Sequence, residues 1–291
     1  MHKIHAKTIL SAKNGMNLYR GCTHGCIYCD SRSTVYGMDH DFEDVAVKDN
    51  GLQLLEKALI GKRSKCMIGT GSMSDPYMPL EAELEITRGA LKLIERYGFG
   101  ATLITKSDLV LRDIDLLASI NSKSKAVVQM TMTTADEELC RKLEPGVCTT
   151  ARRYEVLKEL QKAGIPTVVW LTPVLPYIND TEANLRGILD YCADAGVKGI
   201  ICFGMGLTLR EGNREYFYSQ LDRLFPGSGL KERYIKEFGL AYNLVSPENN
   251  RLMRIFRAFC QDRGIMDNPD EIFRYMNFFE EKEQQTQLSM F

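Results

Sequence analysis

The sequence has no long uninterrupted run of apolar residues, although 44% of its 291 residues are hydrophobic. A transmembrane helix needs about 20 consecutive apolar residues, so no membrane span is predicted. Residues 1–7 include two lysines and two histidines, and neither an apolar stretch nor a small-residue cleavage site follows them. We therefore expect no secretory signal and a cytoplasmic protein that has no contact with membranes.

An excess of charge of either sign is also missing, because 37 Lys and Arg stand against 38 Asp and Glu. This balance argues against a protein that coats nucleic acid over its whole surface, although a local basic face is compatible with it. The apolar content excludes an intrinsically disordered chain, which would combine low hydrophobicity with high net charge. The sequence also has no internal repeat or low-complexity linker that would require a second domain.

The cysteines do not suit a disulfide framework, because their number, nine, is odd. In a reducing compartment such thiols stay free or bind metal. Three of them, Cys22, Cys26 and Cys29, lie within eight residues. The other six are scattered along the chain: Cys66, Cys140, Cys148, Cys192, Cys202 and Cys260.

Short apolar segments alternate with segments of helical periodicity as far as residue 206. The predicted strands are 16–19, 66–68, 101–104, 126–130, 167–171 and 199–203, and the predicted helices are 52–59, 81–97, 113–120, 152–163 and 182–195. Apolar strands that alternate with helices are typical of parallel βα units. Six such units fit either an open doubly wound α/β sheet or a partial barrel. In both folds, ligands gather at the C-terminal ends of the strands.

After residue 207 the pattern predicts helices without clear strands, and we interpret residues 207–283 as a helical extension. The predicted helices are 213–224, 230–238, 247–262 and 269–283. Arg251, Arg254 and Arg257 follow helical spacing and would form a basic ridge. Such a ridge either contacts phosphate or is simply a solvated helix face, which is the commoner case. Residues 284–291 are polar at first and are expected to form a mobile tail.

The segment Gly21-Cys22-Thr23-His24-Gly25-Cys26-Ile27-Tyr28-Cys29 places three thiols in the spacing C-x3-C-x2-C, just after the first strand. Three close thiolates suit a soft metal centre. Structural zinc takes four ligands, and the fourth would have to be His24, Cys66 or Cys148. A 4Fe–4S cluster usually takes four cysteines, so three would leave one iron open to another ligand. A further alternative is three buried cysteines without metal.

The residues around these cysteines are typical of one family. Residues 17–29 read NLYRGCTHGCIYC, with an aromatic residue before the third cysteine. This pattern resembles the radical S-adenosylmethionine (SAM) superfamily, and in particular its spore photoproduct lyase-like branch, whose members are also called DNA repair photolyase-like. Further matching segments are 72–81, 105–107, 112–113, 143–145 and 173–176. The resemblance extends over most of the predicted α/β part.

The resemblance implies a partial (β/α)6 barrel of the TIM type, at residues 1–206, with the cysteine loop at 21–30. It also implies a 4Fe–4S cluster on Cys22, Cys26 and Cys29, with SAM bound at the open iron. An external one-electron reductant would drive cleavage of SAM to a 5′-deoxyadenosyl radical, which abstracts hydrogen from a substrate. In such enzymes the cofactor supplies the chemistry and the protein supplies placement and shielding.

Residues that bind SAM are expected at the strand ends. The candidates are Tyr28, Ser72, Ser74, Asp75, Lys106, Thr131, Thr133, Pro173 and Val174. Tyr28 would lie against the adenine. The serine hydroxyls and Asp75 suit the ammonium group of SAM, because charge-assisted hydrogen bonds are strong. Asp75 is equally well explained as a helix N-cap. Lys106 would bind the carboxylate of SAM, the two threonines its carboxylate or ribose, and Pro173 and Val174 would frame the adenine.

One position departs from spore photoproduct lyase, which uses a cysteine near the end of the second strand to return a hydrogen atom to its product. Ser72 stands there in this chain, and Cys66 lies at the opposite end of the strand. Cys140, Cys148 and Cys202 are alternative donors, although buried cysteines more often act as small core residues. Reversal of a thymine dimer by the same route is therefore not expected.

The last five residues are Gln287, Leu288, Ser289, Met290 and Phe291. They resemble the Gln-Leu-Ser/Asp-Leu-Phe peptide by which bacterial DNA repair and replication proteins bind the sliding clamp, with Met in place of Leu. A polar tail would present this apolar segment to a groove on the clamp. The alternative is an apolar end that folds back onto its own domain.

Three functions follow from these observations. The first is a radical SAM enzyme that acts on nucleic acid, such as a DNA lesion. The second is a radical SAM enzyme that acts on a small metabolite or peptide, which the neutral charge and the missing donor cysteine favour. The third is a non-catalytic metal-binding adaptor of the sliding clamp, in which zinc or a cluster is structural.

Overall fold

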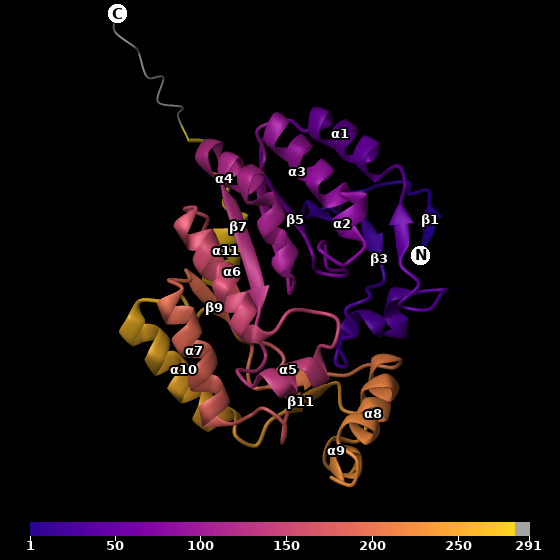
Figure 1. Cartoon of the computed structure of the whole chain (residues 1–291), viewed down its shortest axis with the longest axis vertical. Coiled ribbons are helices and arrows are strands. Elements are labelled where there is room, and N and C mark those ends of the chain that lie inside the picture. Colours follow the sequence, from indigo (N-terminus) through magenta and orange to yellow (C-terminus); the bar gives the residue numbers. More distant parts are fainter. Residues whose placement is uncertain (283–291) are drawn as a thin grey trace, which may run out of the picture.

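The computed structural model describes residues 1–282, in which a parallel sheet is the central element (Figure 1). The order of its six strands is β2-β5-β6-β7-β8-β9, and all neighbours are parallel. The strands are β2 (Gly15–Met16), β5 (Met67–Thr70), β6 (Gly100–Thr105), β7 (Ala126–Thr131), β8 (Thr167–Trp170) and β9 (Gly199–Ile201). The predicted tail and the clamp-like peptide at 287–291 lie outside the described residues.

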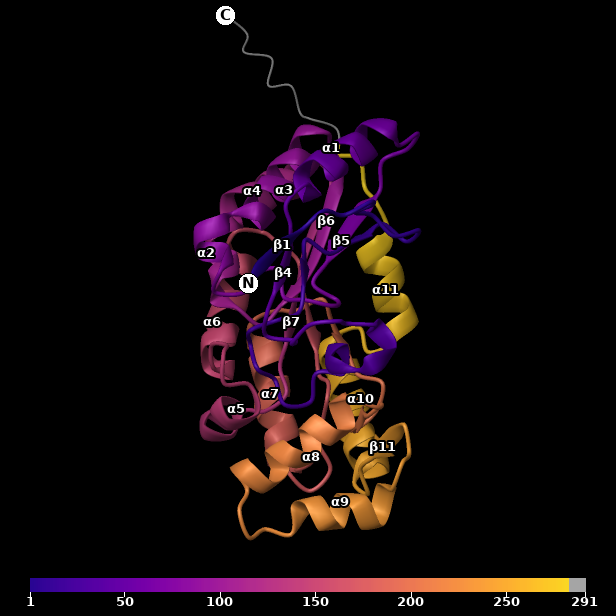
Figure 2. The ribbon, with the colours of Figure 1, turned by 90° about the vertical axis from the view of Figure 1, so that its right-hand side faces the viewer.

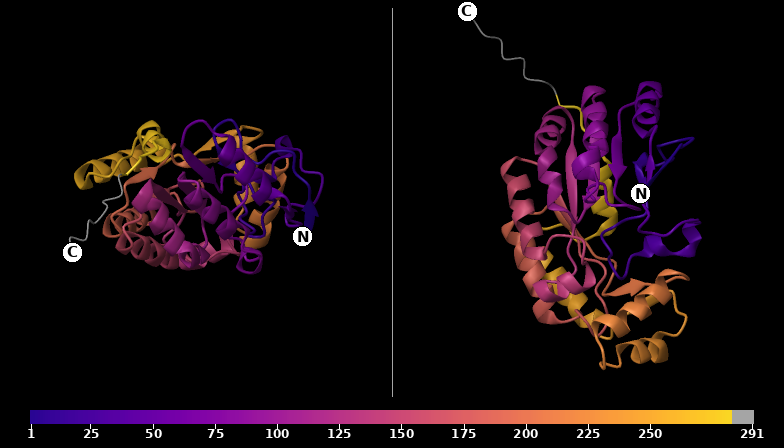
Figure 3. Two further views of the ribbon diagram at one scale, coloured as in Figure 1. Left: turned by 90° about the horizontal axis from the view of Figure 1, so that it is seen from above. Right: turned by 45° about the vertical axis from the view of Figure 1, so that its right-hand side comes forward.

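Helices cover one face of the sheet in an arc, as the view from above shows (Figure 3). They are α1 (Gly51–Gly61), α3 (Ile86–Arg96), α4 (Ile114–Lys123), α6 (Thr150–Lys162) and α7 (Glu182–Asp194). The opposite face packs on α11 (Pro269–Asn277), which Figure 2 shows on the other side of the strands. Sequential strands joined by helices in this order form the partial (β/α)6 barrel that the sequence predicts.

Alternation along the strands explains why both faces are buried. Val128 and Met130 of β7 belong to the large core beneath the outer helices, whereas Val127 packs with Ile272 and Met276 of α11. Successive side chains of a strand point to opposite faces, so a strand that is apolar at every position needs a cover on both sides. Every residue of β7 is buried.

The first predicted strand, 16–19, is divided between two sheets. β2 joins the main sheet, whereas β3 (Tyr19–Arg20) pairs with β4 (Ala46–Lys48), which also pairs with β1 (His2–Ile4). The predicted helix 81–97 is also divided, into α2 (Glu81–Leu84) and α3, because Glu85 adopts a left-handed backbone with φ of 49°. The buried Glu81 carboxylate accepts from the amide of Thr87 at 2.9 Å, which ties the start of α3 back to α2.

Four helices after residue 207 begin at or near the predicted positions: α8 (Asn213–Leu224), α9 (Leu230–Phe238), α10 (Asn249–Arg263) and α11, although α11 ends at Asn277 and does not extend through the predicted range 269–283. The expectation that this region has no strands was wrong. β10 (Gly206–Thr208) and β11 (Asn243–Val245) form an antiparallel pair. Only Leu244 of β11 is buried, so the strand has too few apolar residues to produce an alternating signal.

The extension packs against the cysteine loop and not only against the barrel. Phe217 of α8, Tyr234 of α9 and Leu244 share one hydrophobic cluster with Ile27 and Tyr28. The packing of this cluster therefore joins the C-terminal helices to the segment that holds the thiols. The remaining short elements are η1 (Asp30–Arg32), η2 (Thr34–Tyr36), η3 (Asp108–Asp113) and α5 (Glu137–Leu143). Within residues 1–282, no helix is long and apolar enough to cross a membrane.

Gly71 directly follows β5, and we predict that Gly71→Ala destabilises the fold by at least about 2 kcal/mol. Its φ is +98°, and an added Cβ would lie 2.0 Å from the carbonyl oxygen of Ile104. Urea denaturation followed by circular dichroism under anaerobic conditions measures the change. Gly61→Ala is the control, because no atom lies within 4 Å of its Cβ. Equal stability of the two variants would contradict the prediction.

Candidate active site

The cysteine loop lies between β3 and η1, with Cys22 and Cys26 buried and Cys29 half-buried. Its first turn is fixed by the backbone of a distant segment. The amide of Cys22 donates to the carbonyl of Phe42 at 3.0 Å. Gly21 has φ of +89°, and a Cβ there would lie 2.4 Å from the same carbonyl oxygen. Only glycine therefore allows the chain to enter the loop at this distance.

The segment 143–146 supports the loop from behind. The amide of Ile27 donates to the carbonyl of Leu143 at 3.0 Å, and the amide of Gly146 donates to the carbonyl of His24 at 2.9 Å. A Cβ on Gly146 would lie 2.8 Å from the backbone of His24. These backbone contacts fix the path of the loop that carries the three thiols.

Tyr28 is held by a buried ion pair. Its hydroxyl donates to Glu144, and Arg153 Nη2 lies 2.6 Å from Glu144 Oε2, with both charged side chains fully buried. Burial raises the pKa of Glu144, but Arg153, Lys106 and the hydroxyl of Tyr28 together lower it below its ordinary value, so the carboxylate stays ionised. Arg153 also donates to the carbonyls of Thr131 and Cys148, each at 3.0 Å. The pair thereby links the loop to the end of β7.

A second buried pair, His24 and Asp75, holds the other side of the loop. His24 Nδ1 lies 3.4 Å from Asp75 Oδ2. Burial lowers the pKa of His24, but the charge and hydrogen bond of Asp75 together with the thiol of Cys22 outweigh it and raise the pKa to about 10. The oxygens of Asp75 also accept from the amides of Tyr77 and Lys106 and from the hydroxyl of Thr105, at 2.7–2.9 Å. Asp75 thus joins the ends of β5 and β6 to the loop.

A cavity of about 480 Å³ opens beside the loop, at the carboxyl ends of the strands. Six of the predicted site residues line it: Tyr28, Cys29, Ser72, Lys106, Thr131 and Pro173. Lys106 Nζ lies 5.8 Å from the centre of the Tyr28 ring. Burial lowers the pKa of Lys106, but Cys26 and Glu144 raise it above its ordinary value, so the cavity wall carries a cation.

The other predicted residues lie behind this wall: Cys22, Cys26, Ser74, Asp75, Thr133 and Val174. Ser74 donates to the carbonyl of Tyr19 at 3.3 Å, and Thr133 donates to Glu144 at 3.4 Å. The amide of Val174 donates to the carbonyl of Gly206 at 3.2 Å. The structure therefore divides the twelve predicted residues into six that line the cavity and six that do not.

The mouth of the cavity is aromatic, which the sequence reasoning missed. Trp170 and Phe203 line it, with ring centres 6.1 Å apart. Trp170 donates to Gln129 at 2.7 Å, which fixes its indole. Phe203 is 64% exposed, an unusual position for a phenylalanine. Trp170 is the last residue of β8, and Phe203 follows β9. The rule that ligands gather at strand ends could therefore have predicted both residues.

The supporting residues Glu144 and Arg153 were missed as a pair. The segment 143–145 resembles the family, but nothing in the sequence relates Glu144 to an arginine nine residues later in another helix. Neither composition nor periodicity predicts that Arg153 is buried. Glu144 and Arg153 come into contact because the chain turns between α5 and α6.

None of the alternative donor thiols lines this cavity within the described part of the chain. Cys140 is buried 3.7 Å from Arg153 Nη2, and Cys148 lies 3.2 Å from the carbonyl of Lys106. Cys202 is buried against Met253. Among residues 1–282, Cys29 is the one thiol in the cavity wall, and Ser72 lines the same cavity.

Residues 16–192 match the family model of the radical SAM superfamily. The chain belongs to this superfamily. A radical SAM enzyme uses a 4Fe–4S cluster and SAM, and the expectations of cofactor and enzyme class are confirmed at that level. An uncharacterized protein of Mycobacterium tuberculosis is 30% identical over 234 residues, 78% of this chain and 68% of the relative. An uncharacterized protein of Methanocaldococcus jannaschii is 33% identical, over 62% and 67% of the two chains.

Solved structures support the same radical SAM fold. A spore photoproduct lyase complexed with dinucleoside spore photoproduct superposes with a TM-score of 0.58 at 17% identity, over 84% of this chain and 72% of that one. A radical SAM methyltransferase from Kitasatospora setae gives 0.53 at 15% identity, over 88% and 53%. At these identities the likeness concerns the fold. The expected resemblance to spore photoproduct lyase and the expected partial barrel are confirmed.

The buried pair of this radical SAM enzyme can be tested by removing its cation. Arg153→Met leaves Glu144 as an uncompensated buried charge, and we predict a loss of about 3–5 kcal/mol in the free energy of unfolding. Anaerobic urea denaturation measures it. The double variant Arg153→Met/Glu144→Gln is the matched control, because it removes the unpaired charge and should recover part of the loss. A double variant no more stable than the single one would contradict the role assigned to the charge.

Proposed function

We propose that the enzyme cleaves SAM reductively at a cluster held by Cys22, Cys26 and Cys29 and abstracts hydrogen from a nucleotide base. The observation that carries the proposal is one continuous cavity. Its lining includes Cys29 as well as Trp170 and the exposed ring of Phe203. A cofactor at the thiols and an aromatic substrate at the mouth would therefore face each other across the same cavity.

The donor set fits the cluster. Three thiols share one loop, and the turn at Gly21 and the contact of Gly146 with His24 admit no larger side chain. Three sulfur ligands leave one iron open, which suits a cluster that binds SAM better than a closed structural site does. When bound, the cluster passes an electron from an external reductant to SAM and so supplies the 5′-deoxyadenosyl radical.

The residues of the cavity wall have distinct proposed roles. Lys106 suits the carboxylate of SAM and Ser72 its ammonium group, because both of these groups of SAM are charged and charge-assisted hydrogen bonds are strong. Tyr28 offers a ring face to the adenine, while Thr131 and Pro173 border the same space.

Apart from the cysteines, the residues behind the wall are proposed as positioning residues. The hydrogen bonds of Asp75 already come from four donor groups, so it orients the loop and the backbone of Lys106. Ser74, Thr133 and Val174 likewise hold the chain segments on which the lining residues stand.

The surface beside the mouth favours a nucleic-acid substrate. A groove shares Phe203 and Gly204 with the cavity and continues over α10, where Arg254 and Arg257 line it. In the described part of the chain neither arginine forms an ion pair, whereas Arg251 pairs with Glu182 and Glu248. Aromatic rings stack on bases of any sequence, and unpaired arginines suit phosphates. A nucleotide base at the rings would place its phosphates over these arginines.

One similar protein supports this substrate class, because the spore photoproduct lyase that shares the fold is complexed with a dinucleoside ligand. A relative in Pseudomonas phage M6, 25% identical over 62% of this chain and 36% of its own, is called a radical SAM Nalpha-GlyT isomerase, and its name supports the radical SAM chemistry alone. A small metabolite or peptide is the alternative substrate, which the net charge of −1 favours.

Anaerobic reconstitution should give about four iron and four sulfide per chain, and dithionite should release 5′-deoxyadenosine from SAM. Cys22→Ala should abolish this release, because two thiolates cannot retain the cluster. Cys66→Ala is the matched control and should keep full activity, since Cys66 lies at the far end of β5. Chromatography of the nucleoside product measures both. A reconstituted wild type that never cleaves SAM would refute the proposed chemistry.

Binding of a fluorescent single-stranded oligonucleotide should weaken with salt, and Arg254→Ala/Arg257→Ala should lower the slope of log K against log salt by about 1.4. The control is Arg96→Ala/Arg263→Ala, which removes two arginines away from the groove and should leave the slope unchanged. SAM cleavage without substrate should be unaffected in both variants. Equal slopes in all three proteins would instead favour a small substrate.

The sliding clamp remains a prediction from residues 287–291, which lie outside the described residues. Of the partners, the reductant and the substrate follow from the radical SAM class. A clamp interaction would bring the enzyme to DNA and would agree with the proposed substrate. Calorimetric titration of clamp with the full chain and with a chain truncated before Gln287 separates the two interpretations of this segment.

A further inference from the structure

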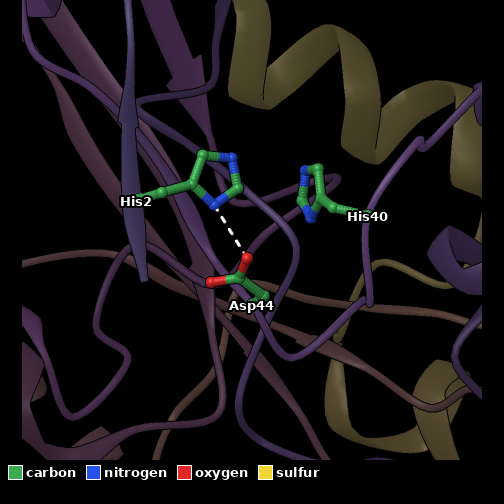
Figure 4. Close-up of side chains that lie close together, drawn as sticks. All are labelled: His2, His40 and Asp44. Carbon is green, nitrogen blue, oxygen red and sulfur yellow. Dashed lines mark hydrogen bonds and ion pairs between the residues drawn. The ribbon is translucent and has the colours of Figure 1, made fainter.

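Two histidines and an aspartate gather at the surface, away from the cavity residues described above. His2 lies in β1, while His40 and Asp44 lie in the segment between η2 and β4 (Figure 4). Each offers one ligand atom, and these atoms all lie within 4.8 Å of one another. The two imidazole rings are 4.7 Å apart and nearly perpendicular. The three groups therefore face a common space from two distant parts of the sequence.

The hydrogen bond of His40 leaves a ligand atom available, whereas His2 Nδ1 and both oxygens of Asp44 make contacts that a metal ion would displace. His40 Nδ1 lies 3.0 Å from the carbonyl of Asp41, which as an acceptor places the proton on Nδ1 and leaves the Nε2 lone pair free. Such a bond to a backbone carbonyl commonly orients a metal-binding histidine. His2 Nδ1 lies 2.9 Å from Asp44 Oδ2, and Asp44 Oδ1 lies 2.7 Å from the amino group of Met1.

We propose that His2, His40 and Asp44 bind a divalent first-row metal ion, with zinc as the reference metal. Two imidazole nitrogens and one carboxylate oxygen form a donor set that zinc accepts, with water in the fourth position. Metal bonds of about 2.0–2.2 Å require the ligand atoms to approach one another to about 3.4 Å. His2 and Asp44 are 38% and 44% exposed, so their side chains have room for this movement.

The site would stabilise the segment that supports the cysteine loop. Phe42, between His40 and Asp44, accepts the hydrogen bond from the amide of Cys22. A metal ion would join this segment to β1 through His2. The site is independent of the proposed substrate and of the cluster ligands, because it uses neither thiols nor cavity residues. Its nitrogen and oxygen donors differ from the three thiols, which favour softer iron–sulfur chemistry.

Zinc titration of cluster-loaded protein, without a polyhistidine tag and in competition with a chromophoric chelator, tests the site. We expect one saturable zinc per chain beyond the metal of the cluster. His2→Ala and His40→Ala should each weaken binding at least about tenfold. His5→Ala is the matched control, because His5 is also exposed but pairs with Asp49 and Asn50 instead. It should bind zinc as the wild type does.

Iron content and SAM cleavage should stay unchanged in all three histidine variants, which separates a lost zinc site from a misfolded chain. The proposal is overturned if cluster-loaded wild type shows no saturable binding below about 1 mM zinc. It is also overturned if His40→Ala binds zinc as tightly as the wild type. A loss of binding in His5→Ala equal to that in His40→Ala would assign the zinc to a different site.

Discussion

The buried ion pair between Arg153 and Glu144 is the interaction on which the site depends. An isolated charge would be costly in this interior, so each partner requires the other and a full set of hydrogen bonds. Glu144 accepts a hydrogen bond from the hydroxyl of Tyr28, and Arg153 donates one to the carbonyl of Thr131 at the end of β7. This one pair therefore positions two parts of the cavity wall. One is the ring of Tyr28, which precedes Cys29 in the chain, and the other is the end of β7.

The arrangement divides the site into a wall and a support. The wall consists of groups that face the cavity, such as Lys106 and Ser72, and the support consists of groups whose hydrogen bonds are already satisfied. Asp75 illustrates the support, because burial would raise its pKa, but His24, the hydroxyl of Thr105 and the amide of Lys106 hold that pKa at about 2. A radical enzyme needs such fixed placement, since the protein contributes orientation and shielding while the cofactor supplies the reaction.

Much of the fold could be predicted because its signals are local. Five apolar strands alternate with helices, and the three thiols lie within eight residues of one another. The rule that ligands gather at strand ends singled out Tyr28, Lys106 and Thr131 as candidates, and all three line the cavity. The break between α2 and α3 could not be predicted in this way, because it depends on Glu81, a residue buried by contacts with distant parts of the chain.

The sequence alone predicted the family and the proposed ligands of the cluster, because the three thiols and the residues around them lie within one loop. Tertiary structure decided which polar groups face the cofactor. Residue type cannot reveal that Asp75 is already saturated with donors, or that Arg153 lies beside Glu144. It also decided that Trp170 and Phe203 share one cavity mouth and that His2 meets Asp44. These contacts join residues far apart in the chain, so packing of the whole barrel determines them.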